Sequence, residues 1–342
     1  MIEDKLKKTA IFTGIFVALS LSIMFYRAAT KSVMIAEAGD AYKTNVGDIR
    51  QYDLRFDKPD KDSEEGVLVI PLESGVTSDN IQFVEKHVRH QFVLYINGKT
   101  PDFYSNNSVI SDLECIESGT YAPLNDKGMV CLTFELDGLY QNETSLGDGE
   151  ITVSFNKTDY ESENVVVIDP VDEIGVQMIP YIKTALGNDD IILYFTTLDD
   201  HLAGDEEVMG LIKDSQADFY IQLGVDDTRE SDSGIRTYYN DRFFIRGFGN
   251  VQLADKLEMN LAKAAECNAL GLAAADESNQ KLSYSVVPSA FATIGNINNR
   301  VDLERLGKDS YIEKCAEGLA EGIRTSFSIN SPIVDEPESD GK

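Results

Sequence analysis

The change in hydrophobic pattern at Asn164 constrains the fold more than any other feature of this sequence. Residues 165–168 are Val-Val-Val-Ile, a continuous apolar run that is typical of a strand buried on both faces of a sheet. Helical and strand-like segments then alternate toward the end of the chain. This alternation predicts an α/β domain over residues 161–328, with a largely parallel sheet flanked by helices.

The segments of this domain follow from their periodicity. Further strands are expected at Ile191–Phe195, Phe219–Leu223, Ile235–Tyr239 and Ser289–Ile294. Helices are expected after the first strand, ending at about Leu186, and at Glu206–Ser215, Val251–Glu266 and Ser310–Phe327. The last two carry an apolar stripe at helical spacing, so each should bury one face against the sheet.

Residues 45–160 follow a different pattern, in which short apolar or alternating runs are separated by turn signals such as Asn97-Gly98. The expected strands are Gln51–Phe56, Gly66–Pro71, Gln91–Ile96, Val130–Leu136 and Ile151–Phe155. These runs lack a helical period. The pattern predicts a small all-β, sandwich-like domain ahead of the α/β domain.

The N-terminus contains an uncharged run of 18 residues, Thr9–Tyr26. A helix of this length, rising about 1.5 Å per residue, just crosses a hydrocarbon core of about 30 Å. We therefore expect a transmembrane anchor at 9–29, between a tip at 1–8 and a stalk at 30–44. Three lysines precede the run, which favours a cytoplasmic N-terminus and a single-pass protein of the cell membrane whose bulk is extracytoplasmic. A cleaved signal peptide is the alternative.

Charge and cysteine content exclude some classes of function. With 30 basic and 59 acidic residues the net charge is −29, which argues against nucleic acid as a partner. The acidic tail at 329–342 is expected to be disordered. Four cysteines without a C-x-x-C motif predict neither a disulfide framework nor a cysteine zinc site. We expect mostly buried free thiols, although Cys115 and Cys131 could pair; Cys267 and Cys315 are expected in helices.

Five sequence fragments carry a family resemblance. They are Val165–Pro170 (VVVIDP), Ala217–Ile221 (ADFYI), Gly234–Tyr239 (GIRTYY), Pro288–Asn299 (PSAFATIGNINN) and Ala316–Ile323 (AEGLAEGI). Asp302 and Leu306 extend the fourth fragment. In their sequences and in their order along the chain, these fragments resemble the zinc-dependent N-acetylmuramoyl-L-alanine amidases, which cleave peptidoglycan stem peptides from glycan. The resemblance covers about Asn164 to Phe327 and implies a bacterial protein with the fold of that catalytic domain.

The resemblance also implies where the chemistry should be. The family binds zinc through two His and one Glu, and a second Glu serves as general base. The two His positions fall on Asp172 and Gly224 here, and the position of the catalytic Glu falls on Thr293. The loop that carries the ligand Glu is missing between residue 170 and the first helix. We therefore expect no zinc cofactor, and we favour a pseudoenzyme over an enzyme.

A rebuilt metal site is the competing interpretation. Asp172 and Glu173 follow a buried strand and, together with Asp226 and His201, could hold a hard cation. Carboxylates solvated in loops are the more ordinary reading of the same residues.

Three functions remain open on these grounds. The first is a membrane-anchored, extracytoplasmic amidase-like protein without hydrolytic activity, which binds peptidoglycan or a cell-wall or division protein during wall remodelling, division or sporulation. The second is an active, divergent peptidoglycan amidase with a rebuilt metal site. The third is a structural or assembly protein that acts through its β domain.

Overall fold

The computed structural model describes residues 50–59, 66–97, 102–124, 128–158, 163–197, 202–227, 232–242 and 245–330. The predicted tip, anchor and stalk lie outside the described residues, as do His201 and residues 331–342 of the predicted disordered tail. Within the described ranges, none of the helices combines the length and the apolar content that a bilayer crossing requires. The transmembrane anchor therefore stays a prediction.

Residues 52–157 form two five-stranded sheets. The first sheet has the order β1 (Tyr52–Asp53), β7 (Ile116–Leu124), β8 (Met129–Leu136), β5 (Gln91–Asn97) and β4 (Ile81–Lys86). The second has the order β2 (Phe56–Asp57), β6 (Val109–Ser111), β3 (Leu68–Pro71), β10 (Glu150–Lys157) and β9 (Tyr140–Leu146). Three short helices lie between successive strands: η3 (Ser78–Asn80), η4 (His87–Arg89) and α2 (Phe103–Asn106).

Alternation along the strands builds the core of this sandwich. Leu68 and Ile70 of β3 point inward, as do Ile151 and Val153 of β10, and all four are buried. Phe92 lies at the centre of the same apolar cluster. The sequence missed β4, β6, β7 and β9. β9 is an edge strand of mostly polar residues, so it carries little hydrophobic signal.

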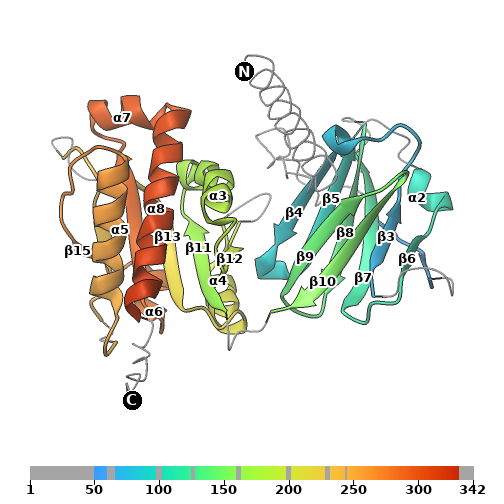
Figure 1. Ribbon diagram of the computed structural model, residues 1–342, viewed down its shortest axis with the longest axis horizontal. Coiled ribbons are helices and arrows are strands. Elements are labelled where there is room, and N and C mark those ends of the chain that lie inside the picture. Colours follow the sequence, from blue (N-terminus) through green and yellow to red (C-terminus); the bar gives the residue numbers. More distant parts are fainter. Residues whose placement is uncertain are drawn as a thin grey trace, which may run out of the picture.

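The second part of the chain is built on a six-stranded sheet (Figure 1). Its order is β12 (Ile191–Phe195), β11 (Asn164–Pro170), β13 (Phe219–Asp226), β16 (Ser289–Asn296), β14 (Thr237–Tyr239) and β15 (Ala273–Ala274). Every neighbouring pair is parallel except β14 and β16, which are antiparallel. The predicted α/β domain with a largely parallel sheet is thus confirmed.

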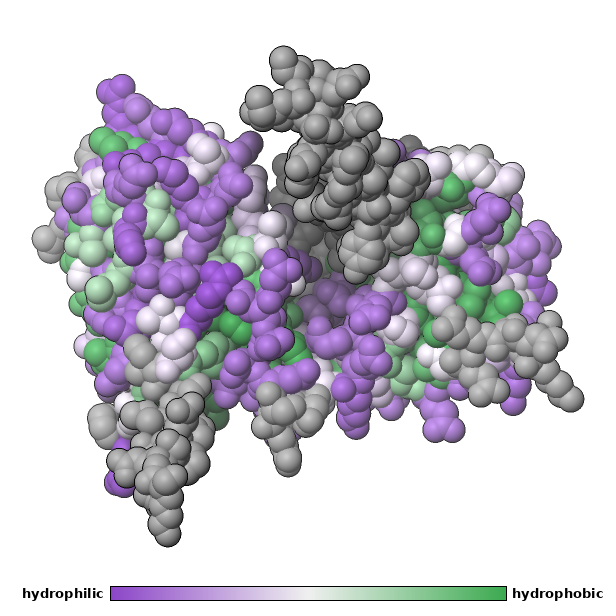
Figure 2. All heavy atoms as spheres, viewed as in Figure 1, coloured by the Kyte–Doolittle hydropathy of each residue, from purple (hydrophilic) through white to green (hydrophobic). Residues whose placement is uncertain are grey.

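Helices cover both faces of this sheet. On one face α3 (Glu173–Leu186), α5 (Asn250–Ala264) and α8 (Asp309–Asn330) pack against apolar residues of β11 and β13. On the other face lie α4 (Asp205–Asp214) and α6 (Gln280–Tyr284). α7 (Arg300–Leu306) precedes α8 at one end of the domain (Figure 1). The outer face of α5 and α8 is mostly hydrophilic, as Figure 2 shows.

The cysteine expectations are corrected in part. Each of the four cysteines is a free thiol, so Cys115 and Cys131 do not pair. Cys131 and Cys315 are buried, whereas the other two are half-buried. Cys267 lies beyond the helix expected to hold it, because α5 ends at Ala264 and Glu266 adopts a left-handed backbone conformation (φ 53°). A non-glycine residue in that region ends a helix.

Close packing of α8 on α5 depends on Gly318. A Cβ at this position would lie 2.8 Å from the Asn260 carbonyl oxygen and 2.9 Å from the Ala264 Cβ. Both are parts of a neighbouring helix that cannot rotate away. We therefore expect Gly318→Ala to lower the free energy of unfolding by about 1–3 kcal/mol, as overpacking does, in urea denaturation of the full chain.

Gly210 of α4 is the matched control for this substitution. It lies inside a helix, and a Cβ there would meet nothing within 4 Å. Because alanine favours the helix over glycine, Gly210→Ala should stabilise the protein by about 0.4–1 kcal/mol. Equal effects at the two positions would show that helix propensity alone, and not the approach of α8 to α5, decides the result at Gly318.

Candidate functional site

The carboxyl ends of β11, β13 and β16 meet at one edge of the sheet, the usual place for a site in open α/β folds. Asp172 follows β11, and Gly224 of β13 is the direct register partner of Thr293 on β16. The structure thus brings together the three positions where the family resemblance places two zinc ligands and the catalytic Glu.

Asp172 connects the first helix of this domain to the neighbouring strand. It is the N-cap of α3, and its Oδ1 accepts a hydrogen bond from the Gly175 N–H at 2.8 Å. Its Oδ2 accepts from the Val225 N–H of β13 at 2.7 Å. A carboxylate is favoured here because it pairs a free amide of the helix start and faces the positive end of the helix dipole. Both carboxylate oxygens are therefore engaged by the backbone.

Gly224 lies directly beneath that carboxylate. A Cβ on Gly224 would come closer than 3.0 Å to Asp172 Oδ2, and it would lie 2.6 Å from the Val171 Cγ2. Any side chain at this position, including a histidine, would require Asp172 and Val171 to move. Asp172 and Gly224 thus interlock, since the carboxylate fills the space that a side chain at 224 would need.

Thr293 is fully buried in β16. Its hydroxyl donates a hydrogen bond to the Arg236 carbonyl oxygen at 2.8 Å and lies 3.4 Å from the Arg236 amide nitrogen. The side chain therefore supports the pairing of β16 with the segment that leads into β14.

The candidates for a hard-cation site have separate partners. Asp226 is only 3% exposed, and its Oδ2 accepts from the Tyr238 hydroxyl at 3.0 Å and lies 3.7 Å from Arg236 Nε. Glu173 is exposed in the first turn of α3. His201 has no described position. Across the described ranges, the structure places no group of three or more His, Cys, Asp or Glu side chains where they could hold a metal ion.

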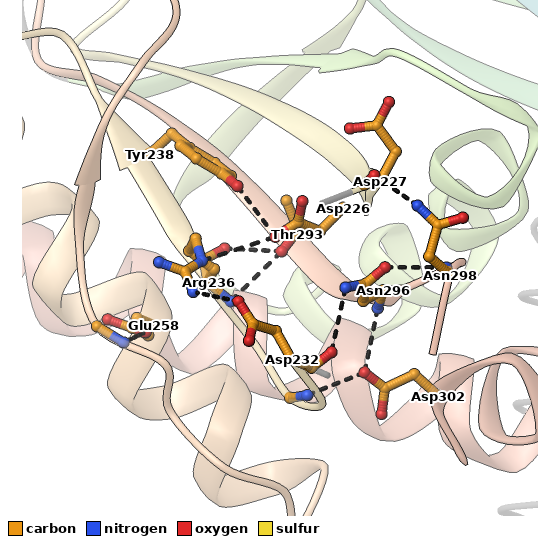
Figure 3. A network of polar contacts seen from close by, with 12 residues as sticks. Asp226, Asp227, Asp232, Arg236, Tyr238, Glu258, Thr293, Asn296, Asn298 and Asp302 are labelled. Atoms are coloured by element: carbon orange, nitrogen blue, oxygen red, sulfur yellow. Dashed lines mark hydrogen bonds and ion pairs between the residues drawn. The ribbon is translucent and has the colours of Figure 1, made fainter. Parts of the chain in front are cut away.

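Arg236 and Tyr238 are the residues at this edge that the sequence did not single out (Figure 3). The Arg236 guanidinium pairs with Asp226 and, at 3.3 Å, with Asp232. The Tyr238 ring stacks on Phe291. Burial, followed by the hydrogen bond to Asp226, raises the pKa of the Tyr238 hydroxyl above its usual value, so this group is a hydrogen-bond donor. Both residues belong to the GIRTYY fragment, and their place in it was the sequence signal that could have assigned them to the site.

Asp302 holds the loops beside this network in place. It is fully buried and accepts hydrogen bonds from the Ser233 hydroxyl at 2.8 Å, the Gly234 N–H at 2.9 Å and the Asn296 N–H at 3.1 Å. Arg305 Nη1 lies 3.2 Å from Asp302 Oδ1, the oxygen that also accepts from Ser233. Asp302 therefore ties the segment before β14 to the end of β16 (Figure 3).

A further buried carboxylate lies on the face of the sheet that α6 covers. Asp169 of β11 is 0% exposed and accepts from the Tyr220 hydroxyl at 2.7 Å and the Thr196 hydroxyl at 2.5 Å. Lys281 of α6 and the Gln222 amide each approach it at 3.3 Å. A buried charge needs partners of this kind. The cluster fastens α6 to the sheet, and its partners are 27 to 112 residues away along the chain, so the sequence could not reveal it.

Solved structures of peptidoglycan amidases are among the proteins similar to this chain. The catalytic domain of CwlV from Bacillus (Paenibacillus) polymyxa var. colistinus is 16% identical, with a TM-score of 0.43, and the match covers 48% of this chain and 99% of that one. The CwlD amidase from Clostridioides difficile, solved in complex with the GerS lipoprotein, is 13% identical with a TM-score of 0.43, covering 49% and 100%.

A curated relative and a family model complete the comparison. The uncharacterized protein YqiI of Bacillus subtilis (strain 168) is 29% identical over 129 residues, and the match spans 38% of this chain and 61% of that protein. The model of the N-acetylmuramoyl-L-alanine amidase family matches residues 172–325. This match covers the helices and most strands of the α/β domain described above. Residues 172–325 therefore form an N-acetylmuramoyl-L-alanine amidase-like domain.

Proposed function

We propose that this protein is a member of the amidase family that does not hydrolyse peptidoglycan and instead binds it, or binds a protein of the cell wall. One observation carries the proposal, namely the interlock of Asp172 and Gly224 at the edge where the family places its zinc. At these two positions the chain has a helix cap and a residue without a side chain.

The residues present do not fit a zinc ion. A catalytic zinc requires three protein ligands, usually histidine nitrogens or carboxylates, and one open position. Asp172 offers oxygens that already accept two backbone hydrogen bonds, Gly224 offers no ligand atom, and the Thr293 hydroxyl is bonded to a carbonyl oxygen. A ligating side chain at 224 would also collide with Asp172.

The polar edge of the sheet supports a binding role. Arg236, Tyr238 and the nearby carboxylates are linked by hydrogen bonds and ion pairs, so the edge is preorganised rather than collapsed (Figure 3). Preorganised polar groups bind without a large ordering cost. We further propose that residues 9–29 anchor the protein in the cell membrane with the rest extracytoplasmic, on the strength of the uncharged run and the lysines before it.

Purified peptidoglycan sacculi test both halves of the proposal. The full-length protein, in detergent, should sediment with sacculi and release no stem peptides with or without added zinc, as measured by mass spectrometry of the supernatant. A catalytically competent amidase of the family serves as the positive control for release. Zinc-dependent release of stem peptides by this chain would overturn the non-hydrolytic role. Failure to sediment would exclude peptidoglycan and leave a protein partner as the ligand.

A further inference from the structure

The β-sandwich and the amidase-family domain meet at an edge strand. Among the strands of the described ranges β12 pairs only with β11, so none of them pairs with its outer side. Such edges attract other strands unless they are covered. The η4 turn, which follows β4 of the sandwich, lies against β12 and α4 (Figure 1).

His87 is the side chain that covers this edge. It is 7% exposed, and its Nδ1 accepts a hydrogen bond from the Phe195 N–H of β12 at 3.1 Å. Its ring meets the Tyr194 ring edge to face, at 5.0 Å and 82°. Because Nδ1 is the acceptor, the proton of the neutral imidazole is on Nε2, which faces Glu85 Oε2 at 3.6 Å.

Glu85 holds His87 in this orientation from within the sandwich. Burial alone would raise the pKa of the Glu85 carboxyl, but the hydrogen bonds from His87 and Asn142 and the charge of Lys183 lower it below its usual value. The carboxylate is therefore ionised at neutral pH. Lys183 belongs to α3 of the amidase-family domain, so charges from both domains meet here.

Tyr194 provides a second attachment. It is fully buried, and its hydroxyl lies 3.0 Å from the Thr158 hydroxyl and accepts from the Gln141 side chain at 3.4 Å. Leu139 and Val88, both from the sandwich half of the chain, pack into the apolar cluster that contains Tyr194 and covers this face of the α/β sheet. The contact thus has an apolar centre as well as specific hydrogen bonds.

We propose that this joint makes the sandwich and the amidase-family domain one cooperative unit with a fixed relative orientation, in which His87 closes the edge of the α/β sheet. Separation would leave the Phe195 N–H without its partner and expose the Tyr194 ring. The sandwich then stays packed against the amidase-family domain as long as both are folded. The sandwich is therefore neither joined to the second domain by a flexible linker nor independent of it. A ligand that contacts both domains would bind them in one fixed relative orientation.

Hydrogen exchange of the full-length protein tests the proposal without any substitution. In low concentrations of denaturant, amides of β8 in the sandwich and of β13 in the amidase-family domain should exchange through the same opening, with the same denaturant dependence. Independent openings of β8 and β13, or two separate unfolding transitions, would overturn it.

Variants of the η4 turn then test the role of His87. His87→Ala should raise the exchange rate of the Phe195 amide by roughly tenfold or more and should also speed exchange in both β8 and β13. His87→Asn keeps an acceptor near the position of Nδ1, so it should restore part of the protection at Phe195. Arg89→Ala, an exposed neighbour in the same turn, should change neither. A His87→Ala effect confined to one domain would contradict the joint.

Discussion

Gly224→Ala is expected to lower the free energy of unfolding by about 1–3 kcal/mol, because its Cβ would overlap the Asp172 carboxylate and approach Val171 Cγ2 to 2.6 Å. Asp172→Ala is expected to cost a comparable amount. It removes the cap of α3, worth about 1 kcal/mol, and leaves the Val225 N–H without its acceptor. Urea denaturation of the full chain measures both.

The double variant shows whether the two positions interlock. With Asp172 shortened, the methyl group at 224 has room on that side, so the combined loss should be smaller than the sum of the single losses by about 0.5 kcal/mol or more. The relief is expected to be partial, because Val171 remains close. Strict additivity would mean that the carboxylate and the glycine do not depend on each other, and the main support for a non-hydrolytic site would be lost.

Asp302→Ala should give the largest loss of stability, about 3–5 kcal/mol, which is typical when one partner of a buried charged network is removed. The substitution leaves the Gly234 and Asn296 amides without their common acceptor and leaves Arg305 beside an empty space. The loops on either side of the Arg236 network should loosen first, and this is visible as faster hydrogen exchange there.

Glu304 is the matched control for Asp302. It lies two residues along the same helix, forms an ion pair with Arg300 at 3.2 Å, and is 66% exposed. Exposed pairs of this kind contribute little, so Glu304→Gln should change stability by less than about 0.5 kcal/mol. If the two substitutions lower the free energy of unfolding equally, the effect at Asp302 comes from α7 itself and not from the loops that Asp302 joins.

Periodicity predicted the architecture well because the buried strands carry their signal locally. The apolar run at Val165–Ile168 and the amphipathic helices each reveal their own burial, so the order of elements could be read directly. The short strand at Thr237–Tyr239 was expected two residues earlier, and its antiparallel direction was not predicted. Direction depends on how the chain returns to the sheet, which a local pattern does not contain.

The sequence predicted where the residues of the site lie but not which groups they contact. The family resemblance placed Asp172, Gly224 and Thr293 at one edge, where the structure has them. It did not reveal that Asp172 caps a helix, although an Asp directly before a helical run is a known start signal. The partners of Asp302 and His87 lie far away in the sequence, at separations of 68 residues for Gly234 and 108 for Phe195, so no spacing rule could find them.

Contacts within the chain order the edge of the sheet where the family resemblance places the site. The sheet, the helices and the loop anchor at Asp302 keep the edge ordered, while Asp172 and Gly224 replace ligand positions with contacts that stabilise the same edge. The Asp172 carboxylate accepts hydrogen bonds from backbone amides of two different elements and so contributes to the order of this edge.

Zinc binding by the full-length protein tests this account most directly. The protein is dialysed against buffer with a small excess of zinc, and metal content per chain is then measured for the wild type and for Asp172→Ala. We expect no stoichiometric zinc in the wild type and no difference between the two proteins. About one zinc ion per chain in the wild type, lost in Asp172→Ala, would contradict the account, because the carboxylate would then serve a metal and not a helix.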